Sequence, residues 1–333
     1  MRGAFFTKLF ASAGTSAAAF VALAGTACAD SGLLFFEAQS VVGWSSRERG
    51  VVWHSMSEHE PMQKNSVGAD WIHRFSGDGG DFASAALQAR LAWDDAEDAP
   101  ELQLYNAYFQ AKSAVGDFRL GHTRVAFGLA SYWDTHSDLL GDLTMRGVSF
   151  DRDWGAGWNL DTERGNAAAT FTAGSGMGFR RYGNWLASAR AALGTLAWDN
   201  WTTGVSVQFG RRLDAMGYDV MSDEPDDVRL VAWDAALNFD AVEQKLEIDA
   251  GRKAHAAFFA ALYRVGVALD ADEQWKIEAQ ASLVHEAGGN AVFAGTCVSF
   301  RPNSDLTLRL MLARDFEGDE TLLVAQAYWY LPI

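Results

Sequence analysis

Hydrophobic and polar residues alternate with a period of two along most of this chain, most regularly at its C-terminal end. Every second position between residues 306 and 312 is a leucine, and residues 323–333 repeat the alternation with several aromatic side chains. Because successive side chains of a β-strand point to opposite sides, each segment has one apolar face and one mixed face. A turn at residues 317–320 joins the two segments, which together predict a β-hairpin.

The same alternation returns about once every 15 to 20 residues, with Gly- and Asp-rich turns in between. A soluble β-sandwich shows a similar pattern, but many such hairpins behind an export signal favour a transmembrane barrel. We therefore predict an all-β protein, a transmembrane antiparallel β-barrel of about 16 strands within a range of 14 to 18. Residues 30–333 are expected to form this single domain, since no linker-like stretch interrupts them.

The first 29 residues have the pattern of a secretory signal peptide. Arg2 and Lys8 give a positive start, an apolar run follows, and small residues surround a cleavage point before Asp30. The apolar run is too short to span a bilayer as a helix. We expect residues 1–29 to be removed during export to the outer membrane of a Gram-negative bacterium.

Charge and composition narrow the function classes. The chain has a net charge of −16, and loss of residues 1–29 removes two bases and no acid, which leaves −18. An acidic chain argues against nucleic-acid binding, which depends on clustered Lys and Arg. Cys297 is the only cysteine after cleavage, so neither an intrachain disulfide nor a cysteine metal site is expected. Cys297 is expected to act as a small packing residue.

Basic residues occur on the polar faces of the expected strands. A water-filled lumen tolerates such charges, whereas the lipid face would penalise each by roughly 2–4 kcal/mol at mid-depth. Acidic residues such as Glu37, Glu247, Asp249 and Glu278 share these faces, so the signs are mixed. The predicted pore-lining bases are Arg90, Lys112, Arg119, Arg124, Arg190, Lys245, Lys276 and Arg309.

Three segments are read as loops because they break the alternation. Residues 45–66 contain His54, His59 and Glu60, which are expected to be solvated rather than to bind a metal. Residues 128–145 are long, acidic and aromatic, and either fold into the barrel as a constriction or cover its outer opening. Residues 213–228 carry an acidic run at positions 223–227, which is typical of a solvated loop.

Positive charge is concentrated in the middle of the chain. Residues 112–212 hold 11 bases and 9 acids, whereas the rest of the mature chain is strongly acidic. Either this section lines an anion-attracting constriction, or the acidic loops elsewhere account for the difference. With Arg119 and Arg190 expected on the lumen side, we predict a weak preference for anions.

No catalytic constellation is recognisable. The chain has no Gly-x-Ser-x-Gly motif, and His122, His136 and His285 have no Ser or acid at a diagnostic spacing. The glycine-rich residues 174–178 lack the Lys and the following helix of a phosphate-binding loop. We therefore expect no enzyme activity, no cofactor and no metal.

The stretch from Asp117 to Leu129 resembles the phosphate-selective porin O/P family. The resemblance is carried by basic residues within the pattern Gly-x-x-x-x-x-Phe-Gly-Leu, and Ala126 stands where the family usually has Pro. The resemblance is most evident over residues 82–160. The rest of the chain is similar to the family only in the spacing of its expected strands. The resemblance implies a 16-stranded, homotrimeric porin that passes small anions.

Taken together, these patterns predict a porin-like outer-membrane channel for the passive diffusion of small hydrophilic solutes, with anions among them. Its expected partners are outer-membrane lipid, the barrel-assembly machinery and further copies of itself. Two alternatives stay open at this point: a structural barrel that forms a sleeve around a periplasmic electron-carrier protein, and a barrel enzyme that acts on lipids.

Overall fold

The computed structural model describes residues 31–56, 63–94 and 98–333, and most of their regular structure is β-strand. The predicted signal peptide, residues 1–29, lies outside the described residues. The strands are β1 (Ser31–Ser45), β2 (Gly50–Val52), β3 (Ser66–Gly77), β4 (Gly80–Asp94), β5 (Ala99–Ala111), β6 (Asp117–Arg124), β7 (Arg152–Thr162), β8 (Gly165–Thr172), β9 (Trp185–Leu193), β10 (Trp201–Met216), β11 (Asp219–Phe239), β12 (Val242–Lys253), β13 (Ala256–Ala268), β14 (Trp275–Glu286), β15 (Gly289–Phe300), β16 (Leu306–Asp315) and β17 (Glu320–Pro332).

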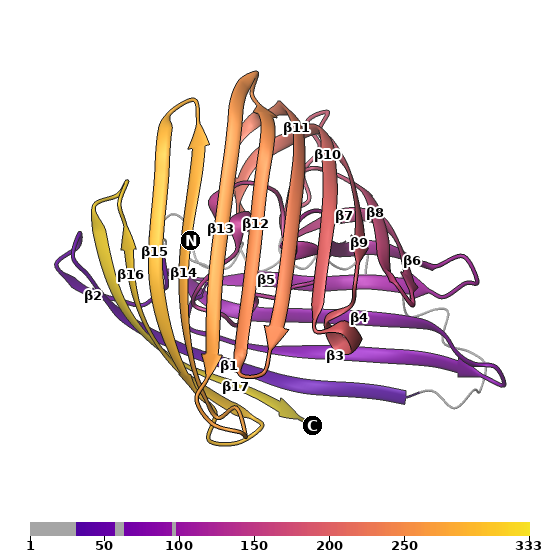
Figure 1. Ribbon diagram of the computed structural model, residues 1–333, viewed down its shortest axis with the longest axis horizontal. Helices are drawn as coiled ribbons and strands as arrows, with labels where there is room; N and C mark the ends of the chain where they lie inside the picture. The colour runs from indigo at the N-terminus through magenta and orange to yellow at the C-terminus, as the bar shows by residue number, and fades with distance from the viewer. Residues whose placement is uncertain (1–30, 57–62, 95–97) are drawn as a thin grey trace, which may run out of the picture.

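These strands form one antiparallel sheet that closes on itself (Figure 1). The ring is completed where β1 pairs with β17, from Phe35 opposite Pro332 to Ser45 opposite Leu322. The three-residue β2 pairs with the end of β1, and β1 pairs directly with β3. The barrel wall therefore consists of 16 strands, β1 and β3 to β17. The predicted fold class and strand number are confirmed.

The alternation in β16 separates the outside of the barrel from its inside. Leu308, Leu310 and Leu312 are 39%, 51% and 53% exposed, whereas Met311 and Ala313 between and beside them are almost completely buried. On the other strands, too, the side chains that point away from the lumen are mostly apolar. The predicted division of faces in β16 is confirmed.

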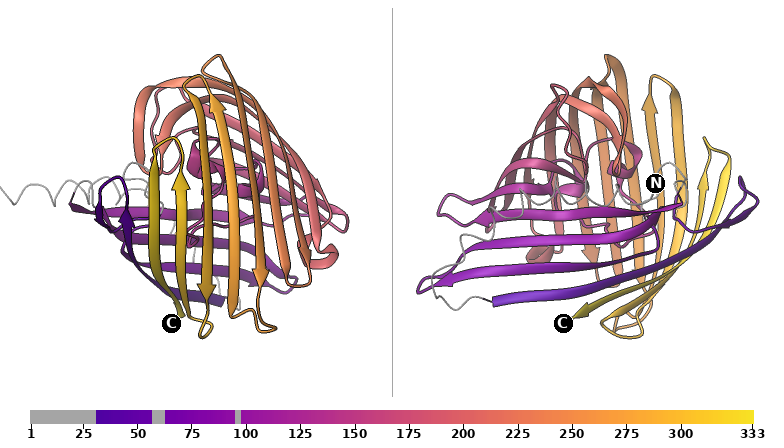
Figure 2. Two further views of the ribbon diagram at one scale, coloured as in Figure 1. Left: turned by 60° about the vertical axis from the view of Figure 1, so that its left-hand side comes forward. Right: turned by 180° about the vertical axis from the view of Figure 1, so that it is seen from behind.

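The two ends of the barrel differ in their connections. β1 begins and β17 ends at one end, here called the terminal end, where the longest connection is residues 194–200. The opposite end, here called the far end, carries longer connections, namely residues 46–65, 125–151 and 173–184. In Figure 1 the C mark lies at the terminal end, and Figure 2 shows the same arrangement from two further directions.

The predicted loop at residues 213–228 is wrong, because these residues belong to the long hairpin of β10 and β11. The strands are joined by a short turn at Gly217 and Tyr218, and the acidic run lies within β11. Arg211 pairs with Asp227 in the ladder, with 3.7 Å between Arg211 Nε and Asp227 Oδ1. Opposite charges across two paired strands stabilise the hairpin, so the acidic residues there favour a ladder rather than a loop.

Short helical elements lie in connections between the strands. A short helix, α2 (Leu196–Asp199), follows the end of β9 at Leu193. The other helical turns are η1 (Leu129–Ser131) and η2 (Leu143–Arg146). In the described part of the chain, no helix combines the length and apolar character needed to cross a membrane.

Candidate functional site: the lumen and its inner segment

Residues 125–151, here called the inner segment, leave the wall after β6 and fold into the barrel. The segment is closed at its neck, where the backbone N–H of Val125 donates to the carbonyl oxygen of Asp151 at 3.2 Å. Figures 1 and 2 show the segment and its helical turns within the ring of strands. Of the two positions considered for residues 128–145, the structure therefore has the one inside the barrel.

The start of the inner segment rests on β12. The backbone N–H of Leu129 donates to Glu247 Oε2 at 3.1 Å, and that of Gly128 donates to Ser206 Oγ at 3.1 Å. Gly128 has φ 57° and ψ −155°, a conformation that only glycine adopts readily. A Cβ at this position would lie 1.7 Å from Glu247 Oε1. The close approach of the backbone to Glu247 therefore requires glycine.

Two apolar clusters fasten the inner segment to the wall. Leu129 and Leu143 pack with inward-facing residues of β9, β10, β11, β13 and β14, and Leu139 and Leu140 pack with residues of β1, β2 and β15 to β17. Complete burial of one leucine side chain contributes roughly 1.5–3 kcal/mol. The segment is therefore a packed part of the barrel interior. The wall residues that contact its leucines are apolar.

Polar contacts hold the middle of the segment to opposite walls. On the β13–β14 side, Arg264 donates to the carbonyl oxygens of Leu140 and Gly141, and Gln280 Nε2 donates to that of Gly141 at 2.8 Å. On the β1 side, His136 Nε2 lies 2.8 Å from Glu37 Oε1. Because the segment contacts both sides, it narrows the lumen across its width.

Two carboxylates of the segment lie in contrasting environments. Desolvation opposes ionisation of Asp134, yet the guanidinium groups of Arg152 and Arg124 hold the pKa of Asp134 well below its usual range. Asp142 caps η2 by accepting the backbone N–H of Thr144 at 2.9 Å. Burial, reinforced by the charge of Asp151, raises the pKa of Asp142 to about 6.

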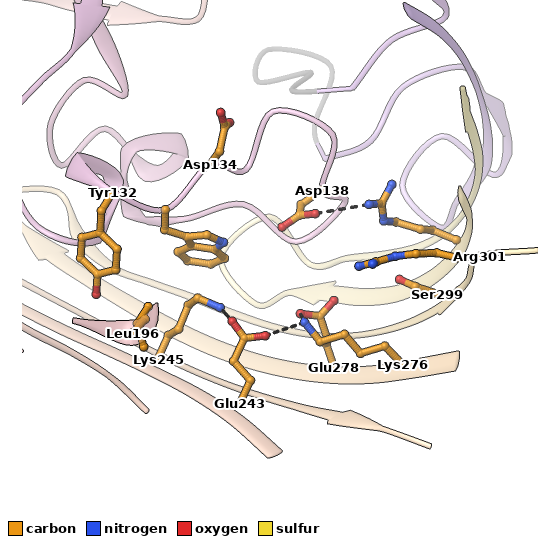
Figure 3. Close-up of a pocket in the computed structure, with 12 residues that line it drawn as sticks. Tyr132, Asp134, Asp138, Leu196, Glu243, Lys245, Lys276, Glu278, Ser299 and Arg301 are labelled. Atoms are coloured by element: carbon orange, nitrogen blue, oxygen red, sulfur yellow. Dashed lines mark hydrogen bonds and ion pairs between the residues drawn. The ribbon is translucent and has the colours of Figure 1, made fainter. Parts of the chain in front are cut away.

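A cavity of about 300 Å³, here called the larger cavity, lies between the inner segment and the terminal end (Figure 3). Its walls come from the segment, from the terminal-end parts of β12 and β14 to β16, and from α2. Both signs of charge and two aromatic rings face it. The lining residues are Tyr132, Trp133, Asp134, Asp138, Leu196, Glu243, Lys245, Lys276, Glu278, Ser299, Arg301 and Arg309.

Charged side chains along this cavity form one alternating chain of ion pairs. It runs from Lys245 through Glu243, Lys276, Glu278, Arg264 and Asp138 to Arg309. Consecutive groups lie within ion-pair distance, for example 3.1 Å from Lys276 Nζ to Glu278 Oε1 and 3.5 Å from Arg309 Nη2 to Asp138 Oδ1. Figure 3 shows the part of this chain that borders the open space.

A cavity of about 50 Å³, here called the smaller cavity, lies on the far-end side of the inner segment. Arg90, Lys64 and Met216 are among the residues that line it. Burial opposes the charge of Lys64, but hydrogen bonds to Asp94 and Glu101 raise the pKa of Lys64 overall. The inner segment therefore separates two spaces of unequal size.

The structure brings together three of the eight predicted pore-lining bases. Lys245, Lys276 and Arg309 line the larger cavity, and Arg90 lines the smaller one. Arg119, on the lumen side of β6, donates to Gln110 Oε1 at 2.8 Å. These five residues lie on the predicted face of the wall.

The remaining three predicted bases line neither cavity. Arg124 pairs with Asp134 of the inner segment. Arg190 is buried and donates to both oxygens of Asp234, at 2.9 and 2.6 Å, so its charge is neutralised within the wall. Lys112 is a correction, because β5 ends at Ala111 and Lys112 lies exposed in the following turn.

Sequence reasoning missed several residues at or beside the larger cavity, namely Arg301 and Trp133, which line it, and Arg264, which contacts Trp133. Arg264 interrupts an apolar run in the sequence, which is a signal for an inward-facing position on a strand. Arg301 follows directly after β15 and resembles any turn residue. Nothing in the alternation marks Trp133, because the inner segment has no strand periodicity.

No metal centre is formed by the described residues, since no group of three or more His, Cys, Asp or Glu side chains is arranged to hold an ion. Of the loop histidines, His54 is buried, whereas His59 and Glu60 lie outside the described residues. Cys297 is a buried free thiol in the apolar cluster of β1 and β15 to β17.

Comparison with known proteins identifies the architecture. No family model matches the sequence, and no curated protein is similar to it. Among solved structures, an anion-selective porin from Comamonas acidovorans has a TM-score of 0.64 at 11% identity, over 91% of this chain and all of that one. OmpT, an outer membrane protein of Vibrio cholerae, has a TM-score of 0.63 at 9% identity, over 92% and 99%.

A variant of the Rh. blastica porin has a TM-score of 0.57 at 13% identity, over 91% of this chain and all of that one. At such low identities these likenesses establish the fold alone. The chain is thus a closed 16-stranded antiparallel barrel of the architecture found in porins.

Proposed function

We propose that this protein is a channel in the outer membrane of a Gram-negative bacterium through which small hydrophilic solutes diffuse passively, small anions among them. One observation carries the proposal: the barrel is closed, its outward side chains are mostly apolar, and many of its charged side chains point into the lumen. A charge on the lipid side costs roughly 2–4 kcal/mol at mid-depth, so this division suits a membrane wall around a hydrated lumen.

The two barrel ends support a particular orientation. Outer-membrane barrels have short periplasmic turns and longer extracellular loops. The terminal end carries the shorter connections, so we assign it to the periplasm and the far end to the outside. The predicted signal peptide at residues 1–29 agrees with export across the inner membrane.

The inner segment sets the size of the passage in this proposal. It contacts β1 on one side and β12 to β14 on the other, and it leaves space mainly on the side of the larger cavity. Solutes therefore pass beside the segment along the charged wall of β12 to β16. A passage of this kind admits small solutes and excludes folded proteins.

Selectivity is assigned to the larger cavity rather than to the middle of the chain. Arg190 is neutralised by Asp234 and Arg124 pairs with Asp134, so neither presents a free charge to a solute. The cavity is instead lined by four bases and four acids, and one of the acids, Asp134, is paired with Arg124 and Arg152 outside this lining. Charges in distant acidic loops are screened over about 8 Å at physiological salt. We therefore expect a weak preference for anions.

The observations favour neither alternative function. A sleeve needs a lumen that accommodates another protein, but here the chain's own inner segment crosses the lumen. For an enzyme, His136 contacts Glu37, but its Nδ1 has no hydrogen-bond partner among the described residues. His285 lies exposed beside Asn290. No serine nucleophile is paired with either histidine there.

Membership of the phosphate-selective porin O/P family and a homotrimeric assembly are further parts of the proposal. Both rest on the resemblance at residues 117–129, which form β6 and the start of the inner segment. Light scattering of the detergent-purified protein measures the assembly directly. A mass three times that of the chain is expected, and a monomer contradicts this part alone.

Proteoliposome swelling tests the proposed channel. Vesicles that contain the refolded protein should swell in small sugars and small organic anions, with rates that fall as the solute grows. The matched control is the same protein left unfolded, which shows a single band with and without heating on a gel. Swelling no faster than in this control contradicts the proposal.

A further inference from the structure

Three methionines from separate parts of the chain border the smaller cavity. Met145 comes from η2, Met177 from the connection between β8 and β9, and Met216 from the end of β10. They are far apart in the sequence, so the fold alone brings their thioether groups to one space. Most of the other residues that line this cavity are polar or charged.

Contacts between the three segments hold the methionines at the cavity. Arg212 of β10 donates to the carbonyl oxygen of Gly147, directly after η2, at 2.9 Å. A Cβ on Gly147 would lie 3.9 Å from Met216 Cε, so the methyl group of Met216 lies beside this helical turn. The backbone of Met177 is held by Trp154, whose Nε1 donates to the carbonyl oxygen of Met177 at 3.1 Å.

His136 brings a ring nitrogen without a partner to the same cavity. The residue lines the cavity and is 7% exposed, and its Nε2 lies 2.8 Å from Glu37 Oε1. Because a carboxylate can only accept, Nε2 of the neutral ring carries the proton and Nδ1 keeps its lone pair. This buried Nδ1 has no hydrogen-bond partner among the described residues. Metal-ligating histidines are commonly held by a carboxylate in this way.

Packing alone does not account for the methionines. A methionine that fills a gap leaves no space, but about 50 Å³ stays open here, which is room for an ion. The bases of the lining do not exclude a cation, because each lies beside a carboxylate. Lys64 Nζ is 3.1 Å from Glu101 Oε2, and Arg90 Nη1 is 3.8 Å from Glu37 Oε1.

We propose that the smaller cavity binds a soft monovalent metal ion of the Cu(I) class. The sulfur atoms of Met145, Met177 and Met216 and Nδ1 of His136 supply the ligands. Thioethers select such soft ions. This donor set differs from the groups of His, Cys, Asp or Glu side chains, of which the described residues form no metal centre. The site goes beyond the proposed channel, because binding at it requires no conduction.

Calorimetric titration with Ag(I) in nitrate buffer tests the site, since silver is a stable soft monovalent probe and its chloride is insoluble. The refolded mature protein carries Cys297→Ala, because a free thiol also binds soft ions. The variants are Met177→Leu and Met216→Leu, which nearly conserve side-chain volume. The matched control is Met221→Leu, which removes an exposed methionine from β11. Heat-modifiable migration verifies that each protein is folded.

The Cys297→Ala protein should bind one Ag(I) tightly per chain, and Zn(II) much more weakly. Loss of even an outer-shell partner lowers metal affinity by roughly 10–100-fold. Met177→Leu and Met216→Leu should therefore each weaken Ag(I) binding by at least about tenfold, whereas Met221→Leu should leave it unchanged. Ag(I) affinity that is unaltered in the first two variants, or Zn(II) binding as tight as that of Ag(I), overturns the site. These results are independent of whether the barrel conducts.

Discussion

Gly128 and Glu247 are in such close contact that a methyl group on Gly128 would lie 1.7 Å from Glu247 Oε1. The adjacent N–H of Leu129 donates to the other oxygen of the same carboxyl group, at 3.1 Å. This contact joins the start of the inner segment to β12, far away along the chain. It holds the start of the segment at one place on the wall, and in the proposed channel it therefore helps to set the width of the passage beside the segment.

Substitution of Gly128 by alanine should displace the inner segment. The new Cβ clashes with Glu247, and alanine is strained at a φ of 57°, with a cost on the order of 1–3 kcal/mol. We expect a changed single-channel conductance, higher on average and more variable between channels. Gly79→Ala is the control, because a Cβ there meets no atom within 4 Å. Wild-type conductance in Gly128→Ala would show that the contact does not position the segment.

Asp142 makes docking of the inner segment depend on pH. Burial raises the pKa of Asp142 to about 6. In the docked segment the carboxyl group of Asp142 therefore keeps its proton up to about pH 6, whereas in the released segment it ionises near its ordinary pKa. The corresponding stability is complete below about pH 4 and is lost as the pH rises to about 6. Asp142→Asn keeps the cap on Thr144 and cannot ionise.

Hydrogen exchange of the inner segment, with variant and wild type compared at equal pH, measures this effect. At pH 7 Asp142→Asn should protect the segment more strongly, by up to about a hundredfold for a shift of two pKa units. Below pH 4 the two proteins should exchange alike. Asp223→Asn, which alters an exposed acid in β11, is the control. A pH-independent difference would contradict the titration of Asp142.

Cysteine labelling tests the faces of β16 in the membrane. Leu308 points outward and is 39% exposed, and Arg309 points to the larger cavity. In a Cys297→Ala background, a membrane-impermeant maleimide should modify Arg309→Cys and leave Leu308→Cys unmodified in lipid. The reverse pattern would mean that the strand is shifted by one residue, since a slip of one exchanges the two faces.

The last strand should be required for assembly. Residues 328–333 pair with the first half of β1, for example Tyr330 opposite Glu37, and their loss leaves two strand edges unpaired. Deletion of these residues should therefore leave the protein unfolded in the periplasm. Its migration on a gel, with and without heating, reports the outcome. Normal heat-modifiable migration would show that closure between β1 and β17 is dispensable.

The sequence predicted the wall well because wall positions obey a local rule. In β16 every second residue faces outward, and the same period sets the register of most strands, so 16 strands could be counted without any long-range information. The rule fails where opposite charges pair across a hairpin. Asp227 looks like part of a solvated loop until Arg211 is placed opposite to it.

The interior could be predicted only in part, because its contacts join residues far apart in the sequence. Arg190 lies on the expected face of its strand. Only the closed barrel shows that Asp234 lies beside it and neutralises its charge. Likewise, Trp133 has no periodic signal, and its role follows from the approach of Lys245 and Arg264 to its ring. Alternation identifies the inward face, whereas folding decides which inward charges remain accessible.

Single-channel recording of the refolded mature protein in a planar bilayer, under a chloride gradient, tests the central claim most directly. A channel should give discrete current steps and a reversal potential displaced modestly toward that of chloride. Protein whose folding has been verified by heat-modifiable migration must be used. Discrete steps with a weak anion preference are the predicted result, and the absence of any steps from such folded protein would contradict a passive channel.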